Sequence, residues 1–358
     1  MANNTVKPVC VGISQGDING IGLEVIMKTF SEPAMLEVCT PVLFSSGKTI
    51  TAYRKLIQEE QFNYNSVSGY EGIVMRKFNL FQCYNDEITV EAGRNTPSGG
   101  KYAILSLMTA CDALAKNKID ALVTAPINKN NTYSEQFPYA GHTQFLDEKF
   151  GKGNSLMMLV SDNLKVALAT EHIPVAGVAT TLKRDAIIKK LIILVKTLIK
   201  DFGIDKPKIA VLGLNPHAGD NGTLGNEESE IIYPAIQEAR RQSNTIIMGT
   251  YSADGFFGSG AYSKFDAVMA MYHDQGLIPF KQIAFENGVN FTAGLPVVRT
   301  SPDHGTAYDI AGKNKASESS FRAAVYLACD LVKARKRYVQ NSSNPLKASA
   351  ANANQKDE

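Results

Sequence analysis

The histidines of this sequence are few and grouped, and three of them have the setting of metal ligands. All five lie between residues 142 and 304, each next to glycine, proline or an acidic residue. His172, His217 and His273 follow the apolar runs VALATEH, AVLGLNPH and AVMAMYH. Neutral imidazoles bind zinc-like divalent cations, and three of them leave a metal open for catalysis. The spacing predicts this metal trio; because no pair such as H-E-x-x-H is present, ordinary polar histidines remain the alternative.

A second group of residues has the types that bind anions. Lys281, Asn290 and Arg299 fall within one short segment that follows the third metal candidate. Lysine and arginine together suit a phosphate or a carboxylate, and arginine adds a two-pronged geometry. Surface charge is the alternative for either cation, but it explains Arg299 less well, because Arg299 ends an apolar run.

The stretch SQGDINGIGLEV, residues 14–25, follows an apolar run and invites comparison with a dinucleotide-binding loop. That fingerprint requires G-x-G-x-x-G and an acidic residue about 20 positions later. Gly20 and Gly22 fit, but Val25 takes the third position, and the next apolar run ends LFSSGK without an acid. The sequence therefore predicts a tight strand-to-helix turn and not a Rossmann cofactor site.

Apolar runs alternate with amphipathic stretches along most of the chain, which predicts an α/β fold with a largely parallel sheet. Strands are expected at residues 8–14, 41–46, 120–126, 155–161, 165–170, 208–214, 266–272 and 294–301. Helices are expected at residues 99–116 with Ser98 as the cap, 182–202, 226–241 and 319–338. No clear linker occurs, so residues 1–340 are expected to form one unit of two lobes that share strands around a cleft. The polar segment 341–358 is expected to be a disordered tail.

Composition limits the class of protein further. The 358 residues carry a formal net charge of +2, which gives no global reason to expect nucleic acid or a membrane as partner. The N-terminus lacks a secretory pattern, and no apolar run approaches a membrane span. The five cysteines form no C-x-x-C pair, as is usual in a reducing compartment. A cytoplasmic protein is expected.

Several long motifs resemble those of the 4-hydroxythreonine-4-phosphate dehydrogenase family of vitamin B6 synthesis. They are GHTQFL, GLNPHAGDNGTLGNEE, MYHDQGLIPFK and GVNFTAGLPVVRTSPDHGTAYDIAG. The segment DHGTAYDIAGKNKA also resembles the HGSAPDIAGK loop of isocitrate and isopropylmalate dehydrogenases, which bind NAD or NADP without a Rossmann fold. The resemblance implies their two-lobed fold. Against the family opening TPGEPAGIGP, the departures are Ser14, Gln15, Asp17 and Asn19.

The resemblance also assigns roles to particular positions. Divalent-metal ligands fall on His172, His217 and His273, with zinc, magnesium, cobalt or manganese as the ion and both subunits of a homodimer contributing. Substrate contacts fall on His142, Thr143, Lys281, Asn290 and Arg299. The cofactor is expected at His304, Gly305, Thr306 and Ala307, and it is NAD in preference to NADP, because only Lys313 and Lys315 are available nearby for a 2′-phosphate. Catalytic roles are implied for Lys281 and for Asp254 as the base, although a simple turn aspartate is the alternative for Asp254.

The implied reaction is oxidation of the C3 hydroxyl of 4-phosphooxy-L-threonine, followed by decarboxylation to 3-amino-2-oxopropyl phosphate. Three alternatives remain open from the sequence. The departures in the N-terminal loop and the pair Asn130–Asn131 leave room for threonate or erythronate 4-phosphate as the substrate. Three histidines on a metal could also activate water for hydrolysis. A non-catalytic nucleotide- or phosphate-binding protein would leave the metal trio unexplained.

Overall fold

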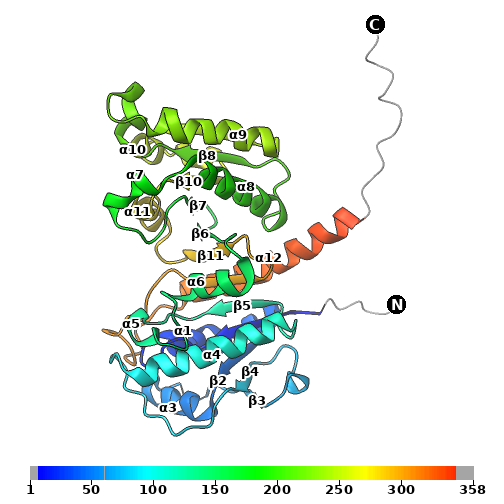
Figure 1. Ribbon diagram of the computed structural model, residues 1–358. Helices are drawn as coiled ribbons and strands as arrows, with labels where there is room; N and C mark the ends of the chain where they lie inside the picture. Colours follow the sequence, from blue (N-terminus) through cyan, green and yellow to red (C-terminus); the bar gives the residue numbers. More distant parts are fainter. Residues whose placement is uncertain (1–6, 60, 344–358) are drawn as a thin grey trace.

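A computed structural model describes residues 7–59 and 61–343, and these residues form one twelve-stranded sheet flanked by helices (Figure 1). The strand order is β3-β4-β2-β1-β5-β12-β11-β6-β7-β10-β8-β9. The strands are β1 (Val9–Ser14), β2 (Cys39–Ser45), β3 (Asn65–Val67), β4 (Asn79–Gln82), β5 (Ala121–Thr124), β6 (Leu156–Val160), β7 (Lys165–Leu168), β8 (Lys208–Leu212), β9 (Ile246–Tyr251), β10 (Ala267–Ala270), β11 (Val289–Ala293) and β12 (Val298–Pro302). All eight predicted strands are present.

The sheet is parallel on both sides and antiparallel in its middle. Strand β11 is antiparallel to both β6 and β12, and β6 is antiparallel to β7, whereas the remaining pairs are parallel. The predicted α/β class with a largely parallel sheet is therefore confirmed. The sheet runs unbroken through the lower and upper parts of Figure 1, and the division of residues 1–340 into two lobes stays a prediction.

Helices cover the sheet, so the central strands are apolar on both faces. The α-helices are α1 (Gly22–Ser31), α2 (Ala34–Val38), α3 (Gly47–Ile57), α4 (Pro97–Ala115), α5 (Lys129–Thr132), α6 (His142–Leu146), α7 (Val178–Thr181), α8 (Arg184–Lys200), α9 (Tyr233–Ser243), α10 (Ala253–Gly258), α11 (His273–Ala284) and α12 (Ser319–Ser343). Strands β1, β5 and β10 are buried along their whole length. On α8 the buried Leu191, Leu194 and Leu198 recur at helical spacing and form the face toward the core.

Three of the predicted helix boundaries require correction. Helix α4 is capped by Thr96 and not by Ser98, because the Thr96 hydroxyl accepts the N–H of Gly99 and Pro97 takes the first helical position. The helix predicted at 226–241 begins with a π-helical turn, Glu228–Ile232, before α9.

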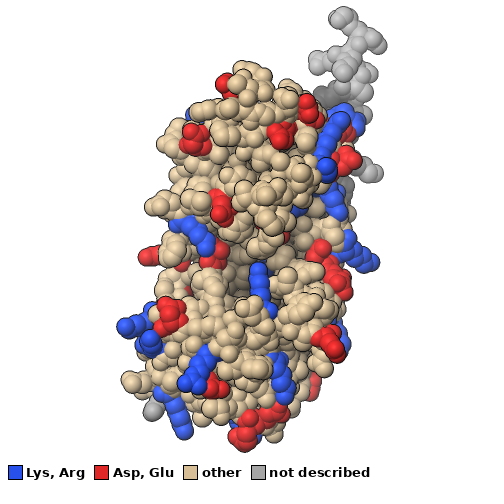
Figure 2. Space-filling view, turned by 60° about the vertical axis from the view of Figure 1, so that its left-hand side comes forward, with Lys and Arg blue, Asp and Glu red and all other residues tan. Residues whose placement is uncertain are grey.

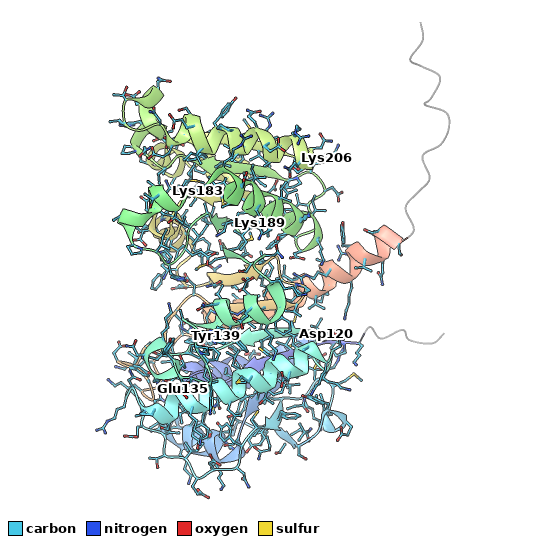
Figure 3. The ribbon with its side chains drawn as sticks, in the orientation of Figure 1. Asp120, Glu135, Tyr139, Lys183, Lys189 and Lys206 are labelled. Carbon is cyan, nitrogen blue, oxygen red and sulfur yellow. The ribbon has the colours of Figure 1, made fainter. Side chains whose placement is uncertain are left out.

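Helix α12 runs five residues beyond the predicted end at Tyr338 and reaches Ser343, so the first three residues of the predicted tail are helical. The rest of that prediction, residues 344–358, lies outside the described residues. Ion pairs join α12 to the sheet and to the loop after α8: Lys336 donates to Asp120 before β5 at 3.0 Å, and Arg335 donates to Asp201 at 2.7 Å (Figure 3 labels Asp120).

In the described part of the chain, no helix combines the length and apolar character needed to cross a membrane.

Candidate active site

A cavity of about 590 Å³ opens between the two parts of the molecule and gathers most of the predicted site residues. Thr124 at the end of β5, Arg299 on β12 and His304 beyond it line one side, while His172 after β7 and His273 at the start of α11 line the other. The remaining predicted residues in the lining are His142, Thr143, Lys281, Asn290 and Gly305. Figure 2 shows a hollow at mid-height on this face of the molecule, with a basic side chain in it.

Arg299 provides a buried positive charge that the protein itself does not neutralise. Its side chain is 2% exposed, and its hydrogen-bond partners in the described residues are the hydroxyls of Thr124 (2.6 and 3.2 Å) and Thr292 (3.1 Å). Burial lowers the pKa of the guanidinium to about 10. A buried cation without a carboxylate partner is costly, so this arrangement is suited to an anionic ligand.

Polar atoms without a protein partner line the same cavity. In the described residues, the buried atoms His142 Nε2, Asn290 Oδ1 and His304 Nε2 have no hydrogen-bond partner. Burial, with the nearby charge of Arg299, lowers the pKa of His142 well below its ordinary value, and burial also lowers the pKa of His304. Both imidazoles are therefore neutral at pH 7. Unsatisfied buried groups are rare in native proteins, and three of them on residues that line one cavity indicate a polar ligand.

Two members of the predicted metal trio lie side by side. The ring centroids of His172 and His273 are 5.5 Å apart, and His273 Nδ1 lies 2.7 Å from the Asp274 carboxylate. Burial and the charge of Lys129 lower the pKa of His172, which favours the neutral imidazole that binds metal. The carboxylate beside His273 is the kind of partner that orients a ligating imidazole.

His217 lies apart from this pair and is exposed. It is absent from the cavity lining, and the described residues of one chain hold no group of three His, Cys, Asp or Glu side chains suited to a metal ion. A trio complete within a single chain is therefore not formed. The prediction that both subunits contribute ligands is not tested by one chain.

The loop around His217 has an unusual backbone that Glu228 holds in place. Residues 217–221 all have left-handed φ values, from 43° to 83°. Buried Glu228 accepts the N–H groups of Leu214 and Asn215, both at 2.7 Å, and the side-chain amide of Asn215 at 3.0 Å. These bonds anchor the loop so that His217 projects outward.

The structure separates the predicted base from the cavity and adds a carboxylate that sequence reasoning missed. Asp254 lies on α10, exposed and outside the lining, and its pKa is lowered by a hydrogen bond from Ser252. Asp303 does line the cavity, with its carboxylate 3.6 Å from Lys281 Nζ, and burial raises its pKa. Its position directly after β12 and before His304 is the signal that could have identified it.

Gly20 and Gly22, within residues 14–25, lie where a larger residue would collide with nearby backbone atoms. A Cβ on Gly20 would lie 2.9 Å from the carbonyl oxygen of Thr306, and a Cβ on Gly22 would lie 2.6 Å from that of Gln15. The N–H of Ile21 donates to the Thr306 carbonyl at 3.0 Å. Residues 14–25 therefore pack directly against the predicted cofactor segment, residues 304–307. Thr306 and Ala307 do not line the cavity itself.

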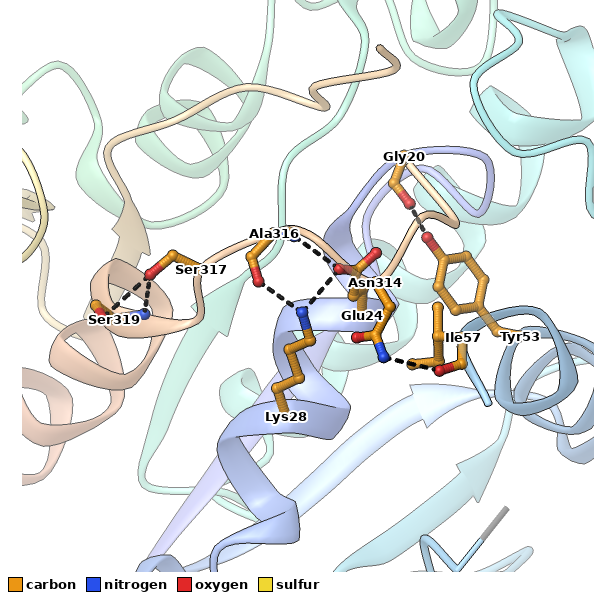
Figure 4. Close-up of polar contacts among 9 residues, drawn as sticks. All are labelled: Gly20, Glu24, Lys28, Tyr53, Ile57, Asn314, Ala316, Ser317 and Ser319. Atoms are coloured by element: carbon orange, nitrogen blue, oxygen red, sulfur yellow. Dashed lines mark hydrogen bonds and ion pairs between the residues drawn. The ribbon is translucent and has the colours of Figure 1, made fainter. Parts of the chain in front are cut away.

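Polar contacts hold the chain that follows this segment (Figure 4). Buried Glu24 accepts the N–H of Ala316 at 2.8 Å and pairs with Lys28 at 3.0 Å, and Lys28 also donates to the Ala316 carbonyl. The Asn314 amide donates to the carbonyl of Ile57 at 3.0 Å. Helices α1 and α3 thus fix the loop between β12 and α12.

Comparisons with known proteins identify the family of this chain. The family model described as pyridoxal phosphate biosynthetic protein PdxA matches residues 37–328. The chain is 51% identical to the 4-hydroxythreonine-4-phosphate dehydrogenase of Bacteroides thetaiotaomicron, over 97% of this chain and 94% of that protein. It is 41% identical to that of Sulfurihydrogenibium sp., over 92% of this chain and 100% of that protein. The crystal structure of the 4-hydroxythreonine-4-phosphate dehydrogenase from Klebsiella pneumoniae matches with a TM-score of 0.79 and 31% identity, over 92% and 99% of the two chains. The chain belongs to the PdxA family.

Proposed function

We propose that this protein is an oxidoreductase that acts on 4-hydroxythreonine 4-phosphate in pyridoxal phosphate biosynthesis, with NAD as the oxidant. Identity of 51% over nearly the whole chain carries the proposal. The cavity supports it, because an uncompensated Arg299 suits a phosphorylated substrate. The secondary alcohol at C3 gives a hydride to the nicotinamide and a proton to a base. The resulting 3-keto acid then loses carbon dioxide to leave 3-amino-2-oxopropyl phosphate.

Residues of this chain bind and orient the substrate in that reaction. Arg299 and Lys281 hold its anionic groups, the phosphate above all. The neutral His142 and Asn290 form hydrogen bonds to the rest of the substrate through their buried atoms Nε2 and Oδ1. Asp303, held near Lys281 and with a raised pKa, is a second candidate beside Asp254 for the proton-accepting group. A divalent cation, when bound, supplies Lewis-acid polarisation of the reacting oxygen.

The proposed metal site is shared between two copies of the chain. His172 and His273 of one protomer, with His217 of the partner subunit, would hold zinc or a similar ion. Exposed apolar side chains on this part of the chain support a second copy as the occupant: Val175, which lines a small cavity with both histidines, is 77% exposed. Ile278 on α11 and Phe285, the residue that ends this helix, are 68% and 79% exposed. Exposed apolar groups of this size are typical of a protein interface.

NAD is proposed for the segment 304–307 in preference to NADP. Lys313, one of the two lysines that could face a 2′-phosphate, donates to the carbonyl of Asp309 at 2.7 Å and is therefore already engaged. The departures from the family pattern do not favour threonate or erythronate 4-phosphate, because Asp17, Asn19 and Asn131 are absent from the cavity lining.

The test is to remove divalent metal, restore it, and follow NADH absorbance with 4-phosphooxy-L-threonine. Metal-dependent NADH formation is the expected result. NADH formation only with threonate or erythronate 4-phosphate would contradict the proposed substrate but leave the proposed NAD-dependent oxidation in place. No NADH with any of the three would contradict the dehydrogenase itself, and phosphate release without NAD would favour a hydrolase.

A further inference from the structure

Asp17 joins three loops that emerge from neighbouring strands of the sheet. It lies between β1 and α1, and its carboxylate accepts the side-chain amide of Asn131 at 2.8 Å and the phenol of Tyr308 at 2.7 Å. Asn131 lies on the short helix α5 in the connection after β5, and Tyr308 belongs to the loop after β12. Strands β1, β5 and β12 are adjacent in the sheet. One carboxylate thus connects segments up to 291 residues apart in the sequence.

The carboxylate of Asp17 is buried and depends on these contacts. It is 1% exposed, and its third donor is the N–H of Asn19 at 2.8 Å, so none of its partners in the described residues is cationic. A buried carboxylate is tolerated only when hydrogen bonds satisfy it, and its three donors are therefore held in defined positions. Burial, followed by the hydrogen bond to Asp17, raises the pKa of the Tyr308 phenol, which stays protonated as the donor.

Tyr308 directly follows the segment proposed to bind NAD, and the junction is strained. Ala307 has φ of +43°, a left-handed conformation that alanine adopts only when its surroundings impose it. Contacts on both sides of Ala307 impose this conformation. The Thr306 carbonyl before it accepts the N–H of Ile21, and the Tyr308 phenol after it donates to Asp17. The Tyr308 carbonyl also packs so closely on Gly93 that a Cβ there would lie 2.8 Å away.

We propose that Asp17 and Tyr308 form a latch that sets the conformation of residues 304–307 for NAD. Both are positioning residues, which act through the backbone of the loop and not by touching the reacting atoms. The inference rests on the proposed placement of NAD. It also gives a role to Asp17, a departure from the family pattern that lies outside the lining of the proposed substrate cavity.

The test is the variant Tyr308→Phe, which removes one oxygen atom and keeps the ring. The matched control is Tyr102→Phe, because the Tyr102 phenol donates to the Asp86 carboxylate at the same 2.7 Å but lies on α4, away from the loop. We expect the KM for NAD to rise about tenfold in Tyr308→Phe, since a hydrogen bond to a charged group is lost. The KM for the phosphorylated substrate and the kcat at saturating NAD should stay near the wild-type values, and Tyr102→Phe should leave all three unchanged.

Amide hydrogen exchange provides a second measurement that does not depend on turnover. Without ligands, peptides covering residues 303–312 should exchange faster in Tyr308→Phe than in the wild type, whereas peptides from α8 should not change. A wild-type KM for NAD together with wild-type exchange would overturn the latch while the proposed function stands. If the wild-type protein forms no NADH, the proposed function fails and the latch fails with it. Faster exchange in all peptides, together with changes in both KM values and in kcat, would show a general loss of stability. That result would also overturn the latch.

Discussion

The ring centroids of His172 and His273 lie 5.5 Å apart in one chain, and both residues line a small cavity together with Val175. The two residues come from separate crossover connections, after β7 and after β10, which are adjacent parallel strands. His217 follows β8, the next strand in the sheet, but its left-handed loop turns it outward. Two of the three proposed ligands thus lie together, and the third lies apart from them in the same chain.

Complementation between inactive variants tests the shared metal site. His172→Ala and His217→Ala should each abolish turnover and weaken zinc binding. When the two variants are co-expressed in equal amounts, half of the dimers are mixed and each mixed dimer keeps one intact site, so activity should return to about a quarter of the wild-type value. Zinc content per dimer, measured after dialysis, should recover in parallel. No recovery after mixing would show that a single chain supplies all the ligands.

Replacement of Arg299 should separate ligand binding from stability. Arg299→Met removes the buried charge, and we expect the KM for the phosphorylated substrate to rise about 100-fold. Without ligand, the melting temperature should be equal to or above that of the wild type, because a charge without a carboxylate partner is costly to bury. Inorganic phosphate should raise the melting temperature of the wild type and of the exposed control Arg94→Met, but not that of Arg299→Met. A phosphate response in Arg299→Met would remove this residue from the anion site.

The neutral state of His142 predicts how stability changes with pH. Its folded-state pKa lies well below the ordinary 6.5, so the unfolded chain binds a proton that the folded protein does not. Stability should therefore be complete above pH 6.5 and fall as the pH decreases below that value. His142→Gln should show a smaller loss of melting temperature between pH 7 and pH 5 than the wild type, whereas the neighbouring Thr143→Ser should keep the wild-type slope. Equal slopes in all three would contradict a buried neutral His142.

The left-handed conformation of Ala307 predicts an unusual response to glycine. Glycine adopts φ of +43° without strain, so Ala307→Gly should change the free energy of unfolding by about 0 to 1 kcal/mol in the stabilising direction. The control Ala334→Gly, inside α12, should destabilise by about 1 kcal/mol, because glycine is unfavourable within a helix. Urea unfolding of the ligand-free proteins would measure both. A loss in Ala307→Gly as large as in Ala334→Gly would show that Ala307 is not strained.

The order of the main strands and helices could be predicted from the sequence for a simple reason. Strands covered by helices on both faces are apolar where they are buried, as in LMMLV of β6 and IAVL of β8, and such runs are visible without any tertiary information. The short edge strands β3 and β4 lack this pattern, and β9 at the far edge is partly exposed, so none of these was predicted. Strand β11 was interpreted only as part of an anion-binding segment, although it forms the antiparallel centre of the sheet together with β6.

Much of the chemistry of the site could be predicted from local sequence, because His172, His273 and Arg299 stand on or shortly after apolar strands of one sheet. What the tertiary structure decided depends on distant contacts. The direction of β6 and β11 is set by pairing, and the outward position of His217 is set by Glu228 and a left-handed loop. The bond between Asp17 and Tyr308 joins residues 291 positions apart. No local pattern specifies such a pair, because its energy exists only when the strands that carry the two loops are already side by side.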